Sequence, residues 1–312
     1  MKFEDVLGTQ VLVLDGAMGT MVQNLALDDS AFGGPAFKML TDLLIFSRPD
    51  DLEGIHLKYL QAGANLIETN TFGASPLRLA EFDFKDIDLT DIKAIPPELN
   101  LKESDYSAIT WHLNVEGCRI ARRAIDKYKA SPDYDGRPLF VAGSIGPSNY
   151  VLSKTEADLK KATWSQIVDN NKQQVLGLIE GGADVLLFET QQDILELKAS
   201  LIGAQKAFGE TGSRLPIIAQ VTVDNFSKMQ IFNTDIHAAY VAVQGMGISA
   251  FGINCNTGPE LMQKTVEKLS RVCRHPISIV PNAGQPVSED GKTCYKLQPE
   301  EMADYVERFV KE

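Results

Sequence analysis

The chain has few cysteines, no excess of basic charge and no long hydrophobic run. Only four of its 312 residues are cysteines, and their wide spacing shows no disulfide framework, which favours a reducing, cytoplasmic location. The formal net charge is −12, whereas nucleic acids and anionic membranes are bound by basic surfaces. No apolar stretch approaches the roughly 20 residues of a membrane span, and residues 1–10 lack the apolar segment of a secretory signal. We therefore expect a cytoplasmic protein with neither nucleic acid nor membrane as a partner.

Common cofactor and nucleophile motifs are also absent. There is no C-x-x-C pair, and none of the four histidines stands at the end of an apolar run with a zinc-ligand spacing. The chain has neither a Walker loop nor a G-x-G-x-x-G fingerprint, so nucleotide binding has little support. A serine–histidine–aspartate triad likewise has no supporting context.

What the sequence does contain is seven short, β-rich apolar runs that each end in polar residues. Helical patterns alternate with most of these runs, as is typical of a parallel α/β barrel. In such barrels the carboxyl ends of the strands form the active face. Because a closed barrel needs eight strands, we expect one (β/α)8 TIM-type barrel domain over residues 1–312, with the eighth strand missing at the C-terminus. The seven predicted strands cover residues 11–16, 64–70, 138–146, 183–190, 215–224, 249–256 and 276–283.

Helices are expected where apolar residues recur every three or four positions. Pro49 and Pro299 stand at two expected helix starts, and Gly63 and Gly181-Gly182 at two expected ends. The segment 76–137 is too long for one crossover, so a loop around 84–104 should precede a helix. The predicted helices cover residues 49–62, 111–129, 164–180, 194–208, 261–272 and 299–310.

A glycine-rich turn, Asp15-Gly16-Ala17-Met18-Gly19-Thr20, directly follows the first run. Glycines at that point let backbone N–H groups approach a ligand closely, which suits a carboxylate or a phosphate. A tight strand-to-helix turn without any ligand would produce the same pattern.

Three further side chains stand at predicted strand ends. Glu68 and Glu189 are each followed by threonine, and a carboxylate within an apolar run needs a partner. A ligand's amino group could be that partner, and so could a structural ion pair or a hydrogen-bonded cap. Cys255, within GINCN, could be a nucleophile, a metal ligand or part of the core; its spacing alone favours core packing.

Six motifs, taken in order, resemble the homocysteine S-methyltransferase family from about residue 8 to the end. They are LDGAMGT, ETNTFGAS, VAGSIGP, ETQQDILELKA, GINCNTGPE and PNAGQP. The likeness is greatest to the homocysteine-binding module of the family's cobalamin-dependent members. It implies a zinc ion at the carboxyl face of the barrel, held by three cysteine thiolates. Cys255 matches the first, and the other two are expected as an adjacent pair beyond Glu312.

The resemblance also implies roles for the strand-end residues. Glu189 and Asp15 would bind the substrate ammonium, and the backbone of residues 16–20 its carboxylate. Cys255 is the predicted catalytic and metal-binding residue. The predicted substrate-binding residues are Asp15, Gly16, Ala17, Met18, Gly19, Thr20, Glu68, Asn70, Thr71, Ser144, Glu189, Asn254 and Asn282.

The function implied is methyl transfer to the zinc-activated thiol of L-homocysteine, which gives methionine. A thiol is mostly protonated at neutral pH, and coordination to zinc produces the nucleophilic thiolate. Because no D-x-H-x-x-G corrinoid motif occurs in the chain, methylcobalamin would come from another domain or a partner protein. Two alternatives stay open: a thiol methyltransferase that uses S-methylmethionine or betaine, and a metal-free module that binds without catalysis.

Overall fold

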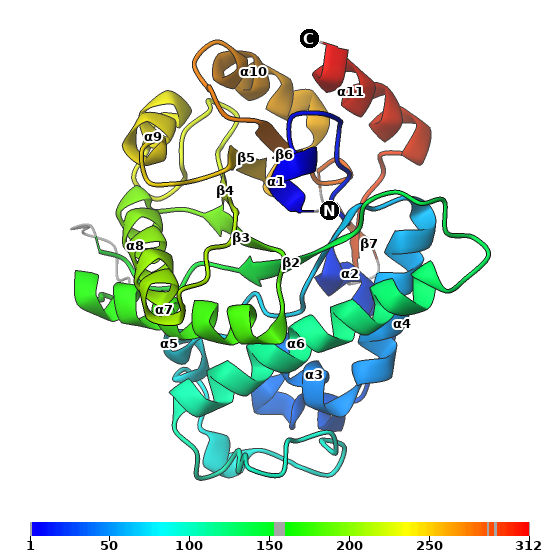
Figure 1. Ribbon diagram of the computed structural model, residues 1–312, viewed down its shortest axis with the longest axis vertical. Coiled ribbons are helices and arrows are strands. Elements are labelled where there is room, and N and C mark those ends of the chain that lie inside the picture. The colour runs from blue at the N-terminus through cyan, green and yellow to red at the C-terminus, as the bar shows by residue number, and fades with distance from the viewer. Residues whose placement is uncertain (1, 153–159, 286, 290–291, 312) are drawn as a thin grey trace.

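The computed structural model describes residues 2–152, 160–285, 287–289 and 292–311. Six parallel strands lie at its centre and form one curled sheet in sequence order, with helices outside it (Figure 1). Six of the seven predicted strands are thereby confirmed, although each is shorter than its apolar run, and β3 extends one residue beyond its run, to Gln191. They are β1 (Leu66–Glu68), β2 (Phe140–Ile145), β3 (Val185–Gln191), β4 (Ile217–Val221), β5 (Ala250–Asn254) and β6 (Ile277–Val280).

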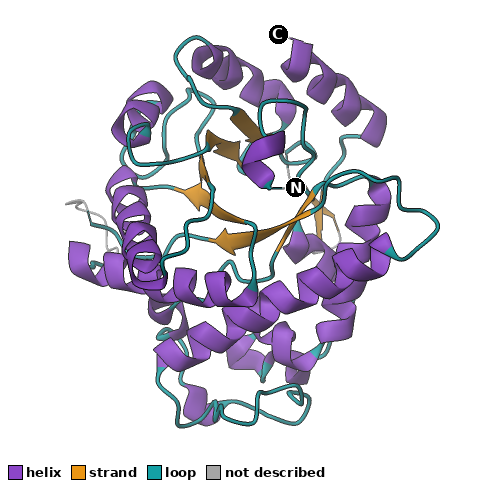
Figure 2. Cartoon of the chain, in the orientation of Figure 1, coloured by secondary structure: helices purple, strands orange, loops and turns teal. Residues whose placement is uncertain are grey.

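Helices connect most successive strands and cover the outer face of the sheet (Figure 2). All six predicted helices are present, with bounds shifted by a few residues, and α9 was not predicted. Within the described ranges no helix is both long and apolar enough to cross a bilayer. The longer helices are α4 (Pro49–Ala62), α6 (Tyr106–Lys129), α7 (Trp164–Gly181), α8 (Ile194–Thr211), α9 (Ile236–Val243), α10 (Pro259–Ser270) and α11 (Pro299–Lys311).

Several short elements were not predicted from the sequence. Residues 3–47 contain brief helical turns, and an antiparallel hairpin follows β6 in the chain. The short elements are α1 (Phe3–Val6), α2 (Met18–Gln23), η1 (Asp29–Phe32), η2 (Pro35–Phe37), η3 (Thr41–Leu43), α3 (Leu44–Ser47), α5 (Pro76–Leu79), η4 (Phe84–Asp86), β7 (Val287–Glu289) and β8 (Lys292–Cys294).

The first predicted strand, residues 11–16, is not a regular strand. Backbone hydrogen bonds connect it to β1: the amides of Asn65 and Leu66 donate to the Val13 carbonyl at 2.7 and 3.1 Å. The Asp15 amide donates in turn to the Leu66 carbonyl at 3.0 Å, which gives a single bridge. No strand pairs with the other side of this segment in the described part of the chain, and a strand needs neighbours to complete its ladder.

An apolar groove of about 700 Å³ separates residues 11–14 from β6. All four residues of β6 are half-buried, and the strand pairs only with β5 among the described strands. Met302, Val306 and Phe309 of α11 also line the groove, and no described residue of that helix is fully buried. The structure is therefore a six-stranded, curled half-barrel; the predicted eight-stranded barrel is not confirmed.

Alternate residues along the strands face the inside of the curl. Phe140, Ala142, Val185 and Leu187 form an interior cluster with Phe3 of α1 and residues of the other strands. Their sequence neighbours, such as Val141 and Leu186, pack against the surrounding helices instead. This alternation follows from the two-residue period of a strand.

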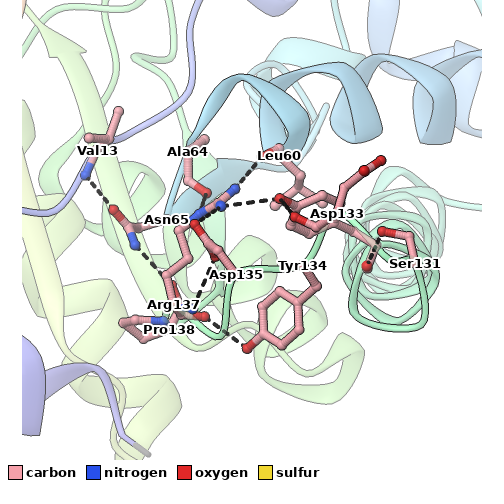
Figure 3. Close-up of polar contacts among 11 residues, drawn as sticks. Val13, Leu60, Ala64, Asn65, Ser131, Asp133, Tyr134, Asp135, Arg137 and Pro138 are labelled. Atoms are coloured by element: carbon pink, nitrogen blue, oxygen red, sulfur yellow. Dashed lines mark hydrogen bonds and ion pairs between the residues drawn. The ribbon is translucent and has the colours of Figure 1, made fainter.

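At the amino ends of β1 and β2, the side chain of Arg137 holds the end of α4 (Figure 3). Its guanidinium donates to the carbonyls of Leu60 and, at 3.1 Å, of Ala64. It also donates to the Tyr128 hydroxyl at 3.1 Å and to Asp135 at 2.8 Å. Its side chain is only 16% exposed, so these carbonyls could not all find water if the guanidinium were removed.

Replacing Arg137 with methionine should therefore lower the free energy of unfolding by about 3 kcal/mol, because it leaves buried carbonyl acceptors without donors. Urea denaturation followed by circular dichroism measures the change. Arg119→Met serves as the control, since Arg119 is 55% exposed and, among the described residues, forms an ion pair only with Glu116 one turn away on the same helix. Equal losses in the two variants would contradict this role of Arg137.

Candidate functional site

Polar side chains end the interior faces of the strands. Glu68, Ser144, Glu189 and Asn254 continue the alternation of the interior residues of β1, β2, β3 and β5. Because the strands are parallel and adjacent, their carboxyl ends meet at one rim. The sequence predicted all four at this site, and the structure brings them together.

Three carboxylates form an acidic cluster at this rim, of which Asp15 is buried and Glu68 and Glu189 are half-buried. The Glu68 amide donates to both carboxylate oxygens of Asp15, at 3.1 and 3.0 Å. Burial raises the pKa of Asp15 and of Glu68, and the nearby Glu189 raises both further. Burial also raises the pKa of Glu189 to about 7, against a hydrogen bond from the Ser144 hydroxyl that lowers it. Among the residues that the structure describes, no basic side chain acts on any of the three, so the cluster is suited to a cationic ligand.

The glycine-rich turn lies beside this cluster. Helix α2 begins at Met18, so the turn supplies the N-terminal amides of a short helix. Gly16 faces Tyr59 of α4, whose ring atoms would stand 3.2 Å from an added Cβ. The Tyr59 hydroxyl donates to the Ala17 carbonyl at 3.3 Å, and burial together with Asp15 and Glu68 raises its pKa to about 12. Tyr59 thus lines the site, although the sequence indicated it only as one residue of a helix face.

Cys255 stands just after β5 in a tight backbone turn. Cys255 and Asn256 have φ angles of +62° and +68°, both in the left-handed region. The Cys255 amide donates to Val280 at 3.0 Å, and its carbonyl accepts from the Thr257 amide at 2.9 Å. Cys255 is exposed, unlike the three other cysteines. The core-packing interpretation of this cysteine was therefore wrong.

The donor set for a metal is incomplete. In the parts of the chain that the structure describes, no three His, Cys, Asp or Glu residues are arranged to hold a metal ion. A structural or catalytic zinc site in proteins takes at least three protein ligands. The single thiolate of Cys255 therefore does not make a zinc site by itself.

The remaining predicted residues have mixed positions. Asn70 donates to the Thr41 carbonyl at 2.8 Å and is buried. Thr71 is fully buried and turns its methyl group toward Gly117 of α6, away from the interior. The Asn282 amide donates to the Thr257 carbonyl at 3.0 Å, which places Asn282 beside the turn that carries Cys255.

Asn254 has a neighbour that the sequence did not single out. The Thr190 amide donates to Asn254 Oδ1 at 2.8 Å, and Asn254 Nδ2 donates to the Thr190 hydroxyl at 2.8 Å. Thr190 has a φ of +57°. A β-branched residue in this region is strained, at a cost of roughly 1–3 kcal/mol. No pattern in the sequence predicts a left-handed backbone conformation at a threonine.

The fold and the rim define an α/β-barrel-type protein with an acidic cluster, a glycine-rich turn and an exposed cysteine at the carboxyl ends of its strands. The family model described as "Homocysteine S-methyltransferase" matches residues 12–312. The chain belongs to the homocysteine S-methyltransferase family, as its motifs predicted.

Named relatives agree with this membership. The chain is 37% identical over 312 residues to a methionine synthase of Mycobacterium tuberculosis (strain ATCC 25618 / H37Rv), and 36% over 310 residues to one of Mycobacterium leprae (strain TN). Each alignment covers 99% of this chain but 23% of the relative, so the chain spans less than a quarter of their length.

Solved structures support the fold. The metallated form of the homocysteine methyltransferase MmuM from Escherichia coli aligns with a TM-score of 0.67 at 22% identity, over 88% of this chain and 85% of that one. Its oxidized form aligns with a TM-score of 0.70 at 21% identity, over 96% and 88%.

Proposed function

We propose that the chain binds L-homocysteine and presents its thiol for methylation, which gives methionine. The observation that carries this proposal is the cluster of Asp15, Glu68 and Glu189, which is shielded from solvent and has no basic partner among the described residues. A ligand ammonium would supply the missing positive charge. Family membership supports homocysteine as the source of that ammonium.

The charges of the site suggest how the amino acid end is held. One ammonium carries three N–H donors, and the carboxylates of Asp15 and Glu189 can accept them as charge-assisted hydrogen bonds. Three ionised carboxylates around one cation would leave an excess of negative charge. Because burial favours the protonated form of all three, the cluster can keep protons in the complex that offset this excess. The amides of the turn from Gly16 to Thr20 would take the substrate carboxylate.

Zinc and the methyl donor belong to the same proposal. Cys255 would be one of three zinc thiolates, and the other two would come from cysteines outside residues 1–312. Bound zinc would supply the charge that turns a thiol into a thiolate. Methylcobalamin would be carried by another domain or by a partner protein. The support for this donor is that both relatives are named methionine synthase and are much longer than the chain.

We also infer a complete eight-stranded barrel that contains residues 1–312 as one domain. Residues 11–14 would be one strand, and a further strand would lie in the groove between them and β6. The support is the unpaired edge of β6, its half-buried side chains and the apolar groove itself. A strand in that position would pair with both edges and cover the apolar face of α11.

Calorimetric titration under reducing conditions tests homocysteine binding. We expect wild-type protein to bind L-homocysteine, and Glu189→Gln to lose about 100-fold in affinity because the ammonium loses a half-buried countercharge. 4-Mercaptobutanoate, which has the thiol and carboxylate but no ammonium, should bind weakly to both proteins and distinguish them little.

Glu196→Gln provides the matched control. Glu196 is also buried, with its pKa raised by burial to about 7. Its carboxylate accepts from the Ser148 amide at 2.7 Å, and its partners do not include the acidic cluster. Homocysteine affinity should be unchanged in this variant. Absence of binding by the wild-type chain, or equal losses in the two variants, would refute the proposed site.

A further inference from the structure

The backbone of β3 changes direction at Thr190. Its φ of +57° lies in the left-handed region, which β-branched residues avoid. The pairing register between β3 and β4 shifts between Phe188 and Gln191, around this residue. Glu189, which precedes Thr190, therefore lies where the regular hydrogen-bond pairing between β3 and β4 is interrupted.

A two-way hydrogen bond with Asn254 holds this turn. Thr190 uses its amide as donor to Asn254 Oδ1 and its hydroxyl as acceptor from Asn254 Nδ2, both at 2.8 Å. The Asn254 carbonyl accepts from the Thr222 hydroxyl at 3.0 Å, which fixes the other end of the residue. Both polar atoms of the Asn254 side chain are thus committed to protein groups, although the residue was predicted to contact substrate.

The pair connects two functional side chains. Asn254 Nδ2 is also 3.4 Å from Glu189 Oε2, and Asn254 directly precedes Cys255 in the chain. Thr190 and Asn254 therefore tie the end of β3, which carries one carboxylate of the acidic cluster, to the end of β5, which carries the exposed thiol. Strained residues persist only where the surrounding structure holds them, and they concentrate at functional sites.

We propose that Thr190 and Asn254 form a positioning pair, which aims the Glu189 carboxylate at the ligand ammonium and fixes its placement relative to Cys255. The pair would determine the preference for thiols that carry an α-ammonium group. This inference rests on the proposed homocysteine site, which it deepens. Neither residue is assigned a bond to the substrate.

Two substitutions at position 190 distinguish the effect of the Thr190 hydroxyl from that of its β-branched shape. Thr190→Val keeps the β-branched shape but removes the hydroxyl, so Asn254 Nδ2 loses its acceptor and Glu189 loses its fixed direction. We expect about tenfold weaker homocysteine binding, and little change for 4-mercaptobutanoate. Thr190→Ser keeps the hydroxyl and should restore homocysteine affinity to within about twofold of wild type.

A double-variant cycle tests whether the two residues act together. Asn254→Ala should weaken homocysteine binding as Thr190→Val does, and it provides the same readout if the valine variant does not fold. The double variant should lose no more affinity than either single variant, because each single substitution already removes the hydrogen bond between Asn254 Nδ2 and the Thr190 hydroxyl. Additive losses would overturn the inference, and so would equal losses for homocysteine and for 4-mercaptobutanoate.

Hydrogen–deuterium exchange of the free protein tests the pair without any ligand. Amides of residues 188–191 should exchange about tenfold faster in Thr190→Val than in Thr190→Ser. If wild-type protein binds no homocysteine, the proposed function fails, while the exchange result still decides whether the pair holds the turn. Equal exchange in the two variants would overturn the positioning role even if homocysteine binds.

Discussion

Replacing Gly252 with alanine is expected to prevent the pairing of β5 with β6. A Cβ at this position would lie 1.7 Å from the carbonyl oxygen and 2.5 Å from the carbonyl carbon of Ser278, its registered partner on β6. These are backbone atoms of a neighbouring strand, so no side-chain rotation relieves the clash. We expect a loss of more than about 4 kcal/mol in the free energy of unfolding, with most of the protein insoluble.

The bare backbone of Gly252 also serves the neighbouring strands. Gln220, Gly252 and Ser278 stand in register on β4, β5 and β6. Gln220 Nε2 donates to Ser278 Oγ at 2.8 Å and so reaches past the glycine to the second strand away. A side chain at position 252 would therefore disturb this interior hydrogen bond as well as the ladder.

Soluble yield and urea denaturation measure the effect of this substitution. Gly209→Ala is the control, since Gly209 lies in α8, with nothing within 4 Å of an added Cβ. That variant should be stabilised by about 0.5–1 kcal/mol, because alanine restricts the unfolded chain and favours helix. If the Gly252→Ala protein is soluble and its urea denaturation midpoint equals that of wild type, the prediction is wrong, because β5 and β6 would then accommodate the added Cβ without loss of stability.

The elements that the sequence predicted are those whose residues repeat with a regular period. The six strands β1 to β6 combine an apolar run with a polar end, which is where Glu68 and Glu189 were predicted, whereas Ser144 was predicted from the family resemblance. Residues 11–16 share this pattern but form only a bridge, because a strand depends on the neighbours across it and no local pattern reports them. Thr71 was misplaced for a related reason: it follows the end of β1, where alternation no longer determines which way a side chain points.

Backbone conformation explains the other differences. Cys255 looked like a core residue by its position after an apolar run, yet its left-handed φ turns the thiol outward. The sequence cannot show that sign of φ for a residue other than glycine. Thr190 was overlooked for the same reason. Tyr59 was expected to pack on a helix face, and only the assembled fold shows its hydroxyl beside the glycine-rich turn.

The same Glu189→Gln substitution that weakens ligand binding should stabilise the ligand-free fold above pH 7. Burial raises the pKa of Glu189 to about 7 in the folded protein, whereas an unfolded glutamate titrates near 4.3. The folded state therefore binds this proton more tightly, and stability is lost as the pH rises from about 4.3 through 7. Ionised Glu189 then costs about 3 kcal/mol at pH 8.5, a cost that glutamine does not have.

Urea denaturation of the ligand-free proteins at pH 4.5 and pH 8.5 measures this difference. The variant should be more stable by about 3 kcal/mol at the higher pH and nearly unchanged at the lower pH, where the wild-type side chain is already protonated. Glu103→Gln, at an exposed position, should show no such dependence. Homocysteine should narrow the gap at pH 8.5, because it binds more tightly to the wild-type protein and so stabilises it more than the variant. A variant less stable than wild type at both pH values would mean that Glu189 stabilises the folded protein. The acidic cluster would then have a structural role, and its presence would not indicate a ligand.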